Sequence, residues 1–408
     1  MIKRTLIMIA IMIFALSICG CFEEEKVVTA DMRGGKINEK PISSELTTST
    51  KKDKTTPQEN TWQESTPITK DKTKSTIEQQ LSSMTLEEKV GQMVMIGVYG
   101  TELNDDIRFL LNKFHFGGVI FFDRNLESIT QTKKFADDIS TIANQKAPLF
   151  FAIDEEGGTV ARGEHLFKVA PSQEEIGFSG DVSEATRCAE HNANILRSIG
   201  VNLNFAPVAD VGSRDTRSFG DDAQTVAEFV EASVQGYEAE NFLYTLKHFP
   251  GIGKSKIDPH QEVSSIEVNR ETLDVEDLPP FEKIISNHDN SKFMIMVGHL
   301  RYDALDPVNS ASLSSAVMTK LLRNELGFTG VVITDDLDMG AIVNNVDVAT
   351  LGVRMIQAGG DIALICHSYD SQQVVYNSIL TAVQRGEISE ARIDESVRRI
   401  LKMKAHLH

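Results

Sequence analysis

The sequence predicts an α/β fold in which eight parallel strands and their helices close into a single TIM-type (β/α)8 barrel. Three observations predict it: short apolar runs alternate with segments of helical period, eight such runs are present, and no low-complexity break interrupts residues 76–408. A doubly wound open sheet is the structural alternative, because a count of strands and helices does not distinguish the two.

The first twenty residues have the layout of a secretory signal. Two basic residues precede an apolar run from Leu6 to Ile18, which is short for a membrane span. The run ends in Cys-Gly-Cys, so residues 1–20 are predicted to be a lipoprotein signal peptide and Cys21 the lipidated first residue of the mature chain. An ordinary signal peptide or an uncleaved anchor are the alternatives. The lipoprotein interpretation and both alternatives place the remaining chain outside the cytoplasm. In the lipoprotein interpretation, the lipid on Cys21 anchors the chain to the cell membrane.

Residues 21–75 are predicted to form a disordered tether from the lipidated Cys21. They are rich in Thr, Ser, Lys, Glu and Gln and contain few large apolar residues. Such a segment cannot bury enough apolar surface to offset the entropy lost on ordering. The barrel domain is therefore expected to occupy residues 76–408.

Charge and cysteine content limit the partners of the folded part. The net charge of −18 argues against nucleic acid and against anionic lipid headgroups. The cysteines of the predicted barrel domain are Cys188 and Cys366, one in a helical stretch and one in an apolar strand. We interpret them as two buried thiols rather than a disulfide framework or a metal site, although the sequence leaves a pairing open.

The predicted elements follow one another in the order that a barrel requires. A capping box at Thr85 and Glu88 marks a helix start, and glycines such as Gly359 mark helix ends. The predicted strands are Met93–Val98, Gly118–Phe122, Leu149–Asp154, Val201–Asp210, Tyr244–Phe249, Phe293–Leu300, Gly330–Asp336 and Ile362–Cys366. Amphipathic helices are predicted at Ala185–Ile199, Thr225–Glu240, Ala316–Leu326 and Val348–Ala358.

Five of these strands end in ionisable or imidazole side chains. The residues concerned are Asp154, Asp210, Lys247 with His248, His299 and Asp335. In a parallel barrel all carboxyl ends of strands meet at one face, where active sites lie. A single such residue could simply mark where solvent begins. A set of five beside strongly apolar sequence indicates a functional rim, because buried charges are costly unless they are paired or used.

A glycine-rich and proline-rich loop follows the fifth strand. Gly253-Lys254-Ser255 suggests a phosphate loop, but that motif needs a glycine five residues earlier, where His248 stands, so a nucleotide site is rejected. Asp258 and His260 are two residues apart, which places both side chains on one face of an extended backbone. A carboxylate beside an imidazole favours the protonated imidazole, so this pair is a plausible mobile acid/base.

The acidic sequence Asp335-Asp336-Leu337-Asp338 directly follows a buried strand. It has three interpretations: a nucleophilic or general-base carboxylate, a cation site, or a solvated acidic turn. A metal site would show further oxygen ligands or His and Cys partners at recognisable spacing, and none is evident. On its own, the acidic turn is the simplest interpretation.

Together these motifs closely resemble glycoside hydrolase family 3, and more narrowly its NagZ-type β-N-acetylglucosaminidase branch. The resemblance runs from about Leu81 to about Met403. It is carried by Ile153-Asp154-x-Glu156-Gly157-Gly158-x-Val160-x-Arg162, Asn204-Phe205-Ala206-Pro207-Val208-Ala209-Asp210, Arg217-Ser218-Phe219-Gly220, Lys247-His248-Phe249-Pro250-Gly251 with Asp258-x-His260, and Thr334-Asp335-Asp336-Leu337-x-Met339.

The resemblance implies a role for each matching residue. Asp335 would be the catalytic nucleophile, His260 the acid/base and Asp258 its partner. The terminal sugar would be held by Asp154, Arg162, Arg217, Lys247 and His248. The implied activity is exo-acting, retaining hydrolysis of terminal β-linked N-acetylglucosamine from glycans such as peptidoglycan fragments or chitooligosaccharides. It implies a single catalytic barrel, a monomer, and neither a metal nor an organic cofactor.

Some positions depart from the pattern of the branch, and alternatives remain. Ile252 stands where a histidine is usual, and Pro259 replaces serine between Asp258 and His260, which could alter loop closure or leaving-group preference. Asp336 could replace Asp335 as nucleophile. The alternative functions are a β-glucosidase-like specificity, transfer of the sugar to phosphate, and a non-catalytic sugar-binding lipoprotein.

Overall fold

The computed structural model describes residues 68–143, 145–212, 215–254, 265–339, 342 and 346–407. The predicted signal peptide, the predicted lipidation site Cys21 and residues 21–67 of the predicted tether lie outside this part of the chain. So do Asp258 and His260. Within the part that is described, no helix combines the length and apolar character needed to cross a membrane.

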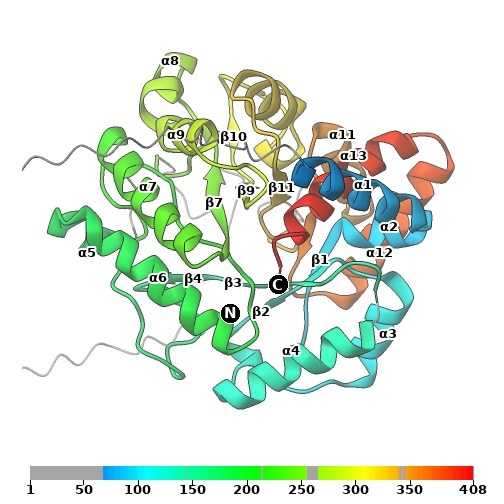
Figure 1. The fold of residues 1–408 in the computed structure, drawn as a ribbon. Helices are drawn as coiled ribbons and strands as arrows, with labels where there is room; N and C mark the ends of the chain where they lie inside the picture. The colour runs from blue at the N-terminus through cyan, green and yellow to red at the C-terminus, as the bar shows by residue number, and fades with distance from the viewer. Residues whose placement is uncertain are drawn as a thin grey trace, which may run out of the picture. The chain divides into compact units, whose positions relative to one another are not determined.

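Eight parallel strands form the central sheet (Figure 1). In sheet order they are β11 (Val331–Thr334), β9 (Phe293–Val297), β7 (Leu243–Phe249), β6 (Leu203–Asn204), β3 (Phe150–Ile153), β2 (Gly118–Phe121), β1 (Val94–Gly97) and β12 (Ala363–Ile365). The end strands β11 and β12 meet through a parallel bridge between Ile333 and Ile362, and the Thr334 N–H donates to the Ile362 carbonyl at 3.1 Å. This closure confirms the predicted barrel and excludes the open sheet.

All eight predicted strands are present, and most are shorter than the apolar runs that predicted them. The largest difference is at β6, which is only two residues long although the apolar run covers Val201–Asp210. Pro207 lacks an N–H and cannot donate to a strand ladder, so the chain leaves the sheet just before it. Pairing returns only as an isolated bridge between Val208 and Lys247.

Helices surround the strands in Figure 1. They are α1 (Ile68–Ser83), α2 (Leu86–Gln92), α3 (Asp105–Phe114), α4 (Ile129–Ala143), α5 (Gln173–Ser179), α6 (Val182–Ser198), α7 (Ala223–Ala239), α8 (Arg270–Thr272), α9 (Pro279–Asn287), α11 (Val348–Ala358), α12 (Tyr369–Gln384) and α13 (Glu390–Lys404). The predicted helix at Ala316–Leu326 forms a π-helix, η4 (Ala316–Glu325). Gly359 adopts φ 118°, as expected of a glycine that ends a helix.

The first helix begins inside the range that composition assigned to the tether. Helix α1 starts at Ile68, and its apolar residues Ile77 and Leu81 are buried, with the helix packed against α13. This packing stabilises turns that the polar composition alone does not predict. The capping box of α2 is confirmed, since Thr85 Oγ1 accepts the Glu88 N–H at 3.3 Å and Glu88 Oε2 accepts the Thr85 N–H at 2.7 Å.

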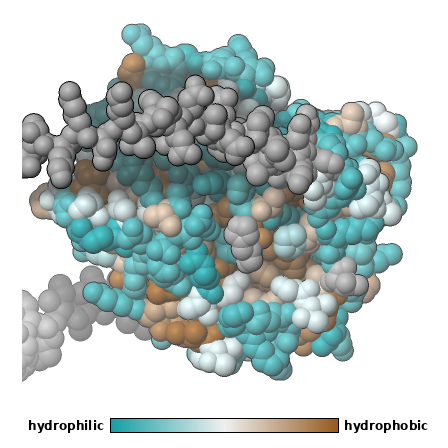
Figure 2. Space-filling model, viewed as in Figure 1, coloured by the Kyte–Doolittle hydropathy of each residue, from teal (hydrophilic) through white to brown (hydrophobic). Residues whose placement is uncertain are grey.

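The apolar core fills the barrel and the space between strands and helices, whereas hydrophilic residues predominate among the coloured residues in Figure 2. Cys188 and Cys366 are both free, which confirms that they do not pair. Cys366 is buried as predicted. Cys188 is only partly buried, because its helix α6 lies on the outside of the barrel, so the prediction of two buried thiols holds for Cys366 and only in part for Cys188.

Candidate active site

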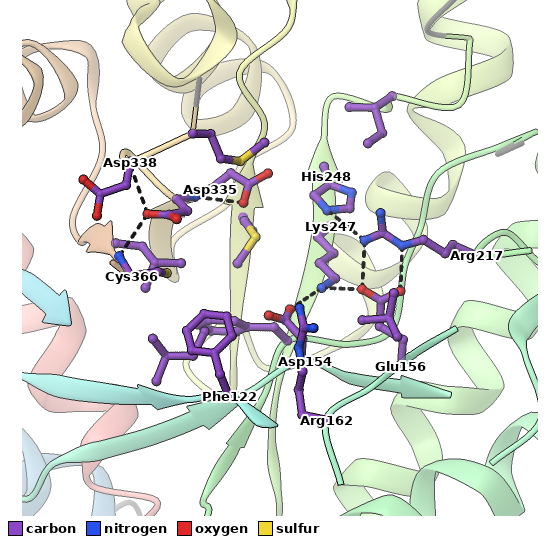
Figure 3. Close-up of a pocket in the computed structure, with 18 of the residues that line it drawn as sticks. Phe122, Asp154, Glu156, Arg162, Arg217, Lys247, His248, Asp335, Asp338 and Cys366 are labelled. Carbon is purple, nitrogen blue, oxygen red and sulfur yellow. Dashed lines mark hydrogen bonds and ion pairs between the residues drawn. The ribbon is translucent and has the colours of Figure 1, made fainter. Parts of the chain in front are cut away.

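A cavity of about 530 Å³ opens at the carboxyl ends of the strands. It lies within the volume range of roughly 300–1,000 Å³ that is typical of small-ligand sites. Figure 3 shows predicted site residues from β3, β7, β11 and the intervening loops facing one another across it. The predicted residues that line it are Asp154, Arg162, Arg217, Lys247, His248 and Asp335. The structure therefore brings together every predicted site residue that it describes.

Lys247 forms the centre of an ion-pair cluster at the inner end of the cavity. Its Nζ lies 2.6 Å from Asp154 Oδ1 and 2.6 Å from Glu156 Oε1, and only 2% of its side chain is exposed. Burial lowers the pKa of Lys247, but the two carboxylates more than offset this and raise it. The ammonium therefore stays charged and fixes both carboxylates in place.

Glu156 is a site residue to which the sequence analysis assigned no role. Arg217 donates to both of its oxygens, Nε to Oε2 and one terminal nitrogen to Oε1, each at 2.8 Å. Burial opposes ionisation of this carboxyl, but Lys247 and Arg217 lower the pKa of Glu156 to about 2. The signal was present in the sequence, because Asp154 and Glu156 are two residues apart and so share one face of an extended segment.

Two consecutive residues of β7, Lys247 and His248, both reach the cavity. A regular strand would send them to opposite faces, but the pairing of β7 with β9 shifts register between Lys247 and Phe249. His248 Nδ1 lies 2.8 Å from Asp210 Oδ2, and its Nε2 lies 3.3 Å from Arg217. The irregular strand end therefore places an ammonium and an imidazole side by side.

Asp210 and His299, two of the residues predicted at the rim, support the site from behind. Asp210 is 1% exposed, and its Oδ1 accepts the N–H groups of His248 and Ile252 at 3.1 and 2.9 Å. His299 is 2% exposed, with Nε2 2.9 Å from the Asp336 carbonyl and Nδ1 2.7 Å from Ser312 Oγ. Both hold backbone segments that carry cavity residues.

Asp335, directly after β11, presents its carboxylate to the cavity. Its N–H donates to the Val297 carbonyl at 3.0 Å, which fixes the start of the turn, and its Oδ1 accepts the Asp336 N–H at 2.8 Å. Burial raises the pKa of Asp335, but the basic side chains of His248, His299 and Lys247 and the Asp336 N–H outweigh burial and lower it. Asp335 therefore faces the cavity as an ionised group.

Asp336 has a different environment although it is the adjacent residue. Its Oδ1 accepts the N–H groups of Asp338 and Cys366, each at 3.0 Å, and this ties the turn after β11 to β12. Burial dominates here and raises the pKa of Asp336 to about 7. The pair thus divides into an ionised carboxylate, Asp335, and a carboxyl group with a structural role, Asp336. Of the two predicted candidates for the nucleophile, this difference favours Asp335. Among the described side chains, no group of three His, Cys, Asp or Glu residues could hold a metal ion.

Glu155 points to the opposite side of its segment from Asp154 and Glu156. It is fully buried, and its Oε2 accepts the Gly163 N–H at 3.0 Å, beside Arg162. Burial is the largest influence and raises the pKa of Glu155 to about 7. Its carboxyl thus holds the short hairpin of β4 (Glu155–Gly157) and β5 (Val160–Ala161), which carries three cavity residues.

We expect Glu155→Gln to stabilise the protein at alkaline pH. The pKa of this acid is about 7 when folded and 4.5 when unfolded, so the wild type loses stability as pH rises from about 4.5 through 7. The amide keeps an acceptor for the Gly163 N–H and cannot ionise. Chemical denaturation should give a gain of about 2–3 kcal/mol at pH 8 and little gain near pH 4. The exposed control Glu164→Gln should show no such pH trend, and a pH-independent effect of Glu155→Gln would contradict the argument.

A parallel barrel with an ionised carboxylate beside a charged, hydrogen-bonding cavity at its carboxyl-terminal face has the groups that glycoside hydrolysis requires. The family model described as "Glycosyl hydrolase family 3 N terminal domain" matches residues 85–403. The chain therefore belongs to glycosyl hydrolase family 3.

Named relatives agree with this assignment. "Beta-hexosaminidase A" of Pseudoalteromonas piscicida is 31% identical over 75% of this chain and 56% of its own length. "Beta-hexosaminidase" of Nitrosomonas eutropha is 32% identical over 74% of this chain and 90% of its own length. The solved family 3 β-N-acetylglucosaminidase of a Paenibacillus species superposes with a TM-score of 0.76 at 38% identity, covering 79% of this chain and 62% of that one. The chain thus spans less than two thirds of the first relative and of that solved structure.

Proposed function

We propose that this chain is an exo-acting, retaining β-N-acetylhexosaminidase that removes terminal β-linked N-acetylglucosamine from a glycan. The observation that carries the proposal is the ionised Asp335 facing a cavity whose inner end is lined by Lys247, Asp154 and Arg217. The names of the relatives support the choice of N-acetylglucosamine over glucose. Peptidoglycan fragments and chitooligosaccharides both present this terminal sugar.

The reaction would proceed by two displacements. The Asp335 carboxylate attacks the anomeric carbon, and the glycosidic C–O bond breaks as the leaving oxygen takes a proton from His260. A water molecule then attacks the anomeric carbon and gives a proton to His260, while the bond from that carbon to the Asp335 oxygen breaks. This step restores the Asp335 carboxylate and the protonated imidazole. Asp258 would favour the protonated imidazole. Two inversions at one carbon retain its configuration.

The ion-pair cluster would recognise the terminal sugar. Lys247 and Arg217 are donors, and the Asp154 carboxylate is an acceptor, so together they match sugar hydroxyls that both donate and accept. Their mutual ion pairs hold them in place before the sugar binds. A ligand that lacks a matching hydroxyl would displace water from this cluster without replacing its hydrogen bond, which disfavours its binding.

The test compares release of nitrophenol from aryl β-N-acetylglucosaminide and aryl β-glucoside by the full chain, with and without added phosphate. We expect turnover of the N-acetylglucosaminide to exceed that of the glucoside by at least about 100-fold, since a site built to hydrogen-bond a substrate group discriminates strongly. Preferred glucoside turnover would contradict the sugar assignment. Formation of a sugar phosphate would show that the reaction is phosphorolysis and not hydrolysis. Binding of the sugar without turnover would indicate a sugar receptor.

We further propose that the chain acts outside the cytoplasm as a monomer anchored to the cell membrane through a lipid on Cys21. The basic residues, the apolar run and the Cys-Gly-Cys sequence at the start of the chain support this. Metabolic labelling with a fatty acid should mark the wild type and not Cys21→Ser, and the variant should leave the membrane fraction. Equal labelling of both would contradict lipidation at Cys21. Light scattering of the purified chain would test the monomer.

A further inference from the structure

Three aromatic side chains stand beside the cavity on loops that follow adjacent strands. Tyr99 follows β1, Phe122 follows β2 and His367 follows β12. Phe122 and His367 line the same cavity as Asp335. These three residues are here called the aromatic rim. They come from a different part of the barrel from the ion-pair cluster, whose residues lie after β3, in β4, in β7 and in the loop before α7. Neither the proposed mechanism nor the recognition of the terminal sugar uses them.

The aromatic rim is held rigidly by Arg124. The Arg124 guanidinium lies 4.3 Å from the centre of the Phe122 ring and 4.6 Å from that of Tyr99. It also donates to the carbonyls of Val98 at 3.1 Å and Cys366 at 2.9 Å. One arginine thus ties together the loops after β1, β2 and β12. A surface fixed in advance loses little conformational entropy when a ligand binds to it.

The remaining contacts join the three rings into one surface. The Tyr99 hydroxyl donates to the His367 carbonyl at 2.8 Å, and the centres of the His367 and Phe122 rings are 5.2 Å apart. Tyr369 packs edge-on against Tyr99, with 5.6 Å between ring centres. The rim is therefore a continuous, mostly aromatic wall that carries one imidazole. The Nδ1 of His367 lies 3.4 Å from Arg124 and its Nε2 lies 3.4 Å from Asp336 Oδ2, and both contacts are long enough for a sugar hydroxyl to replace them.

Exposure distinguishes the rim from the ion-pair cluster. The side chain of Lys247 is 2% exposed, whereas that of His367 is 49% exposed and Tyr99 is 45% exposed; Phe122, at 8%, is buried. The cluster thus lies at the closed end of the cavity, and Tyr99 and His367 place their part of the rim toward solvent. An enzyme that removes terminal sugars must hold the terminal ring at the closed end of the cavity. The rest of the bound glycan therefore extends through the open side.

We propose that Tyr99, Phe122 and His367 form a binding subsite for the second sugar ring of a β-linked oligosaccharide, the ring that becomes the leaving group. Aromatic faces offer apolar contact to the C–H face of a pyranose, and a neutral imidazole can bond one of its hydroxyls. This assignment rests on the proposed function. It makes short oligosaccharides, rather than glycosides with small aglycones, the preferred substrates.

The test uses the full chain with two substrates whose leaving groups are both alkyl alcohols, N,N′-diacetylchitobiose and methyl β-N-acetylglucosaminide. Only the first has a second ring. In Tyr99→Ala and His367→Ala, the ratio of kcat/KM for chitobiose to kcat/KM for the methyl glycoside should fall about tenfold, the size expected for loss of an aromatic contact. Tyr99→Phe, which keeps the ring, should retain most of the ratio. Phe109→Ala removes another exposed aromatic ring, on α3, and serves as the control.

The outcomes separate this assignment from the proposed function. A ratio that stays within twofold of the unaltered chain in both alanine variants, or that falls equally in the Phe109→Ala control, would overturn the subsite while leaving the glycosidase activity established. Loss of activity on both substrates to the same extent would instead place the rim in the terminal-sugar site and would also overturn it. Absence of turnover of either substrate by the unaltered chain would reject the proposed function and this assignment with it.

Discussion

Replacing Asp335 with asparagine is expected to lower kcat for N-acetylglucosaminides by roughly 10⁴-fold or more. The amide occupies the same space and keeps an oxygen to accept the Asp336 N–H, so the turn after β11 should remain intact. It cannot form the glycosyl-enzyme, because the neutral amide is a poor nucleophile. Steady-state kinetics should therefore show the loss in kcat, while calorimetric binding of the sugar product persists.

The adjacent Asp336→Asn variant is the matched control. The asparagine keeps an oxygen that can accept the N–H groups of Asp338 and Cys366, and burial already keeps the wild-type carboxyl largely protonated below pH 7. We therefore expect kcat to fall by no more than about tenfold, far less than in Asp335→Asn. The reverse order of effects would make Asp336 the nucleophile and would refute the assignment of Asp335.

Replacing Lys247 with methionine is expected to destabilise the fold by about 3–5 kcal/mol, as measured by chemical denaturation at pH 7. The change leaves the Asp154 and Glu156 carboxylates close together at the closed end of the cavity without their shared cation. Arg217 still neutralises Glu156 in part, so the expected loss in the free energy of unfolding is smaller than the cost of two unpaired charges. KM for the sugar should rise as well, because a donor to its hydroxyls is lost.

Two comparisons separate this effect from a general loss of packing. The double variant Lys247→Met with Glu156→Gln removes one of the stranded carboxylates and should recover part of the lost stability, which a double-mutant cycle would report as coupling. Lys320→Met changes an exposed lysine and should shift the free energy of unfolding by less than about 0.5 kcal/mol. A Lys247→Met variant as stable as Lys320→Met would show that the cluster has no net structural role.

Several features of the site could be predicted because they are local. Asp154, Lys247, His248 and Asp335 each follow or end a strongly apolar run, and the common direction of barrel strands brings such residues to one face. The same reasoning did not assign a role to Glu156, although its spacing from Asp154 was visible. Its function depends on Arg217, a residue 61 positions away, and no local pattern shows that partnership.

The sequence by itself determined the order and number of the strands in the central sheet and the chemical types of residue at their carboxyl ends. These follow from hydrophobic periodicity, which the backbone geometry of each element imposes within a few residues. Only the tertiary structure decided which of two adjacent aspartates is ionised, since Asp335 faces basic side chains while Asp336 is buried against backbone N–H groups. Only the fold, likewise, brought Tyr99 and His367 together from opposite ends of the barrel sequence. Burial and electrostatic fields are sums over neighbours that the closed barrel assembles, so they cannot be read from any single segment.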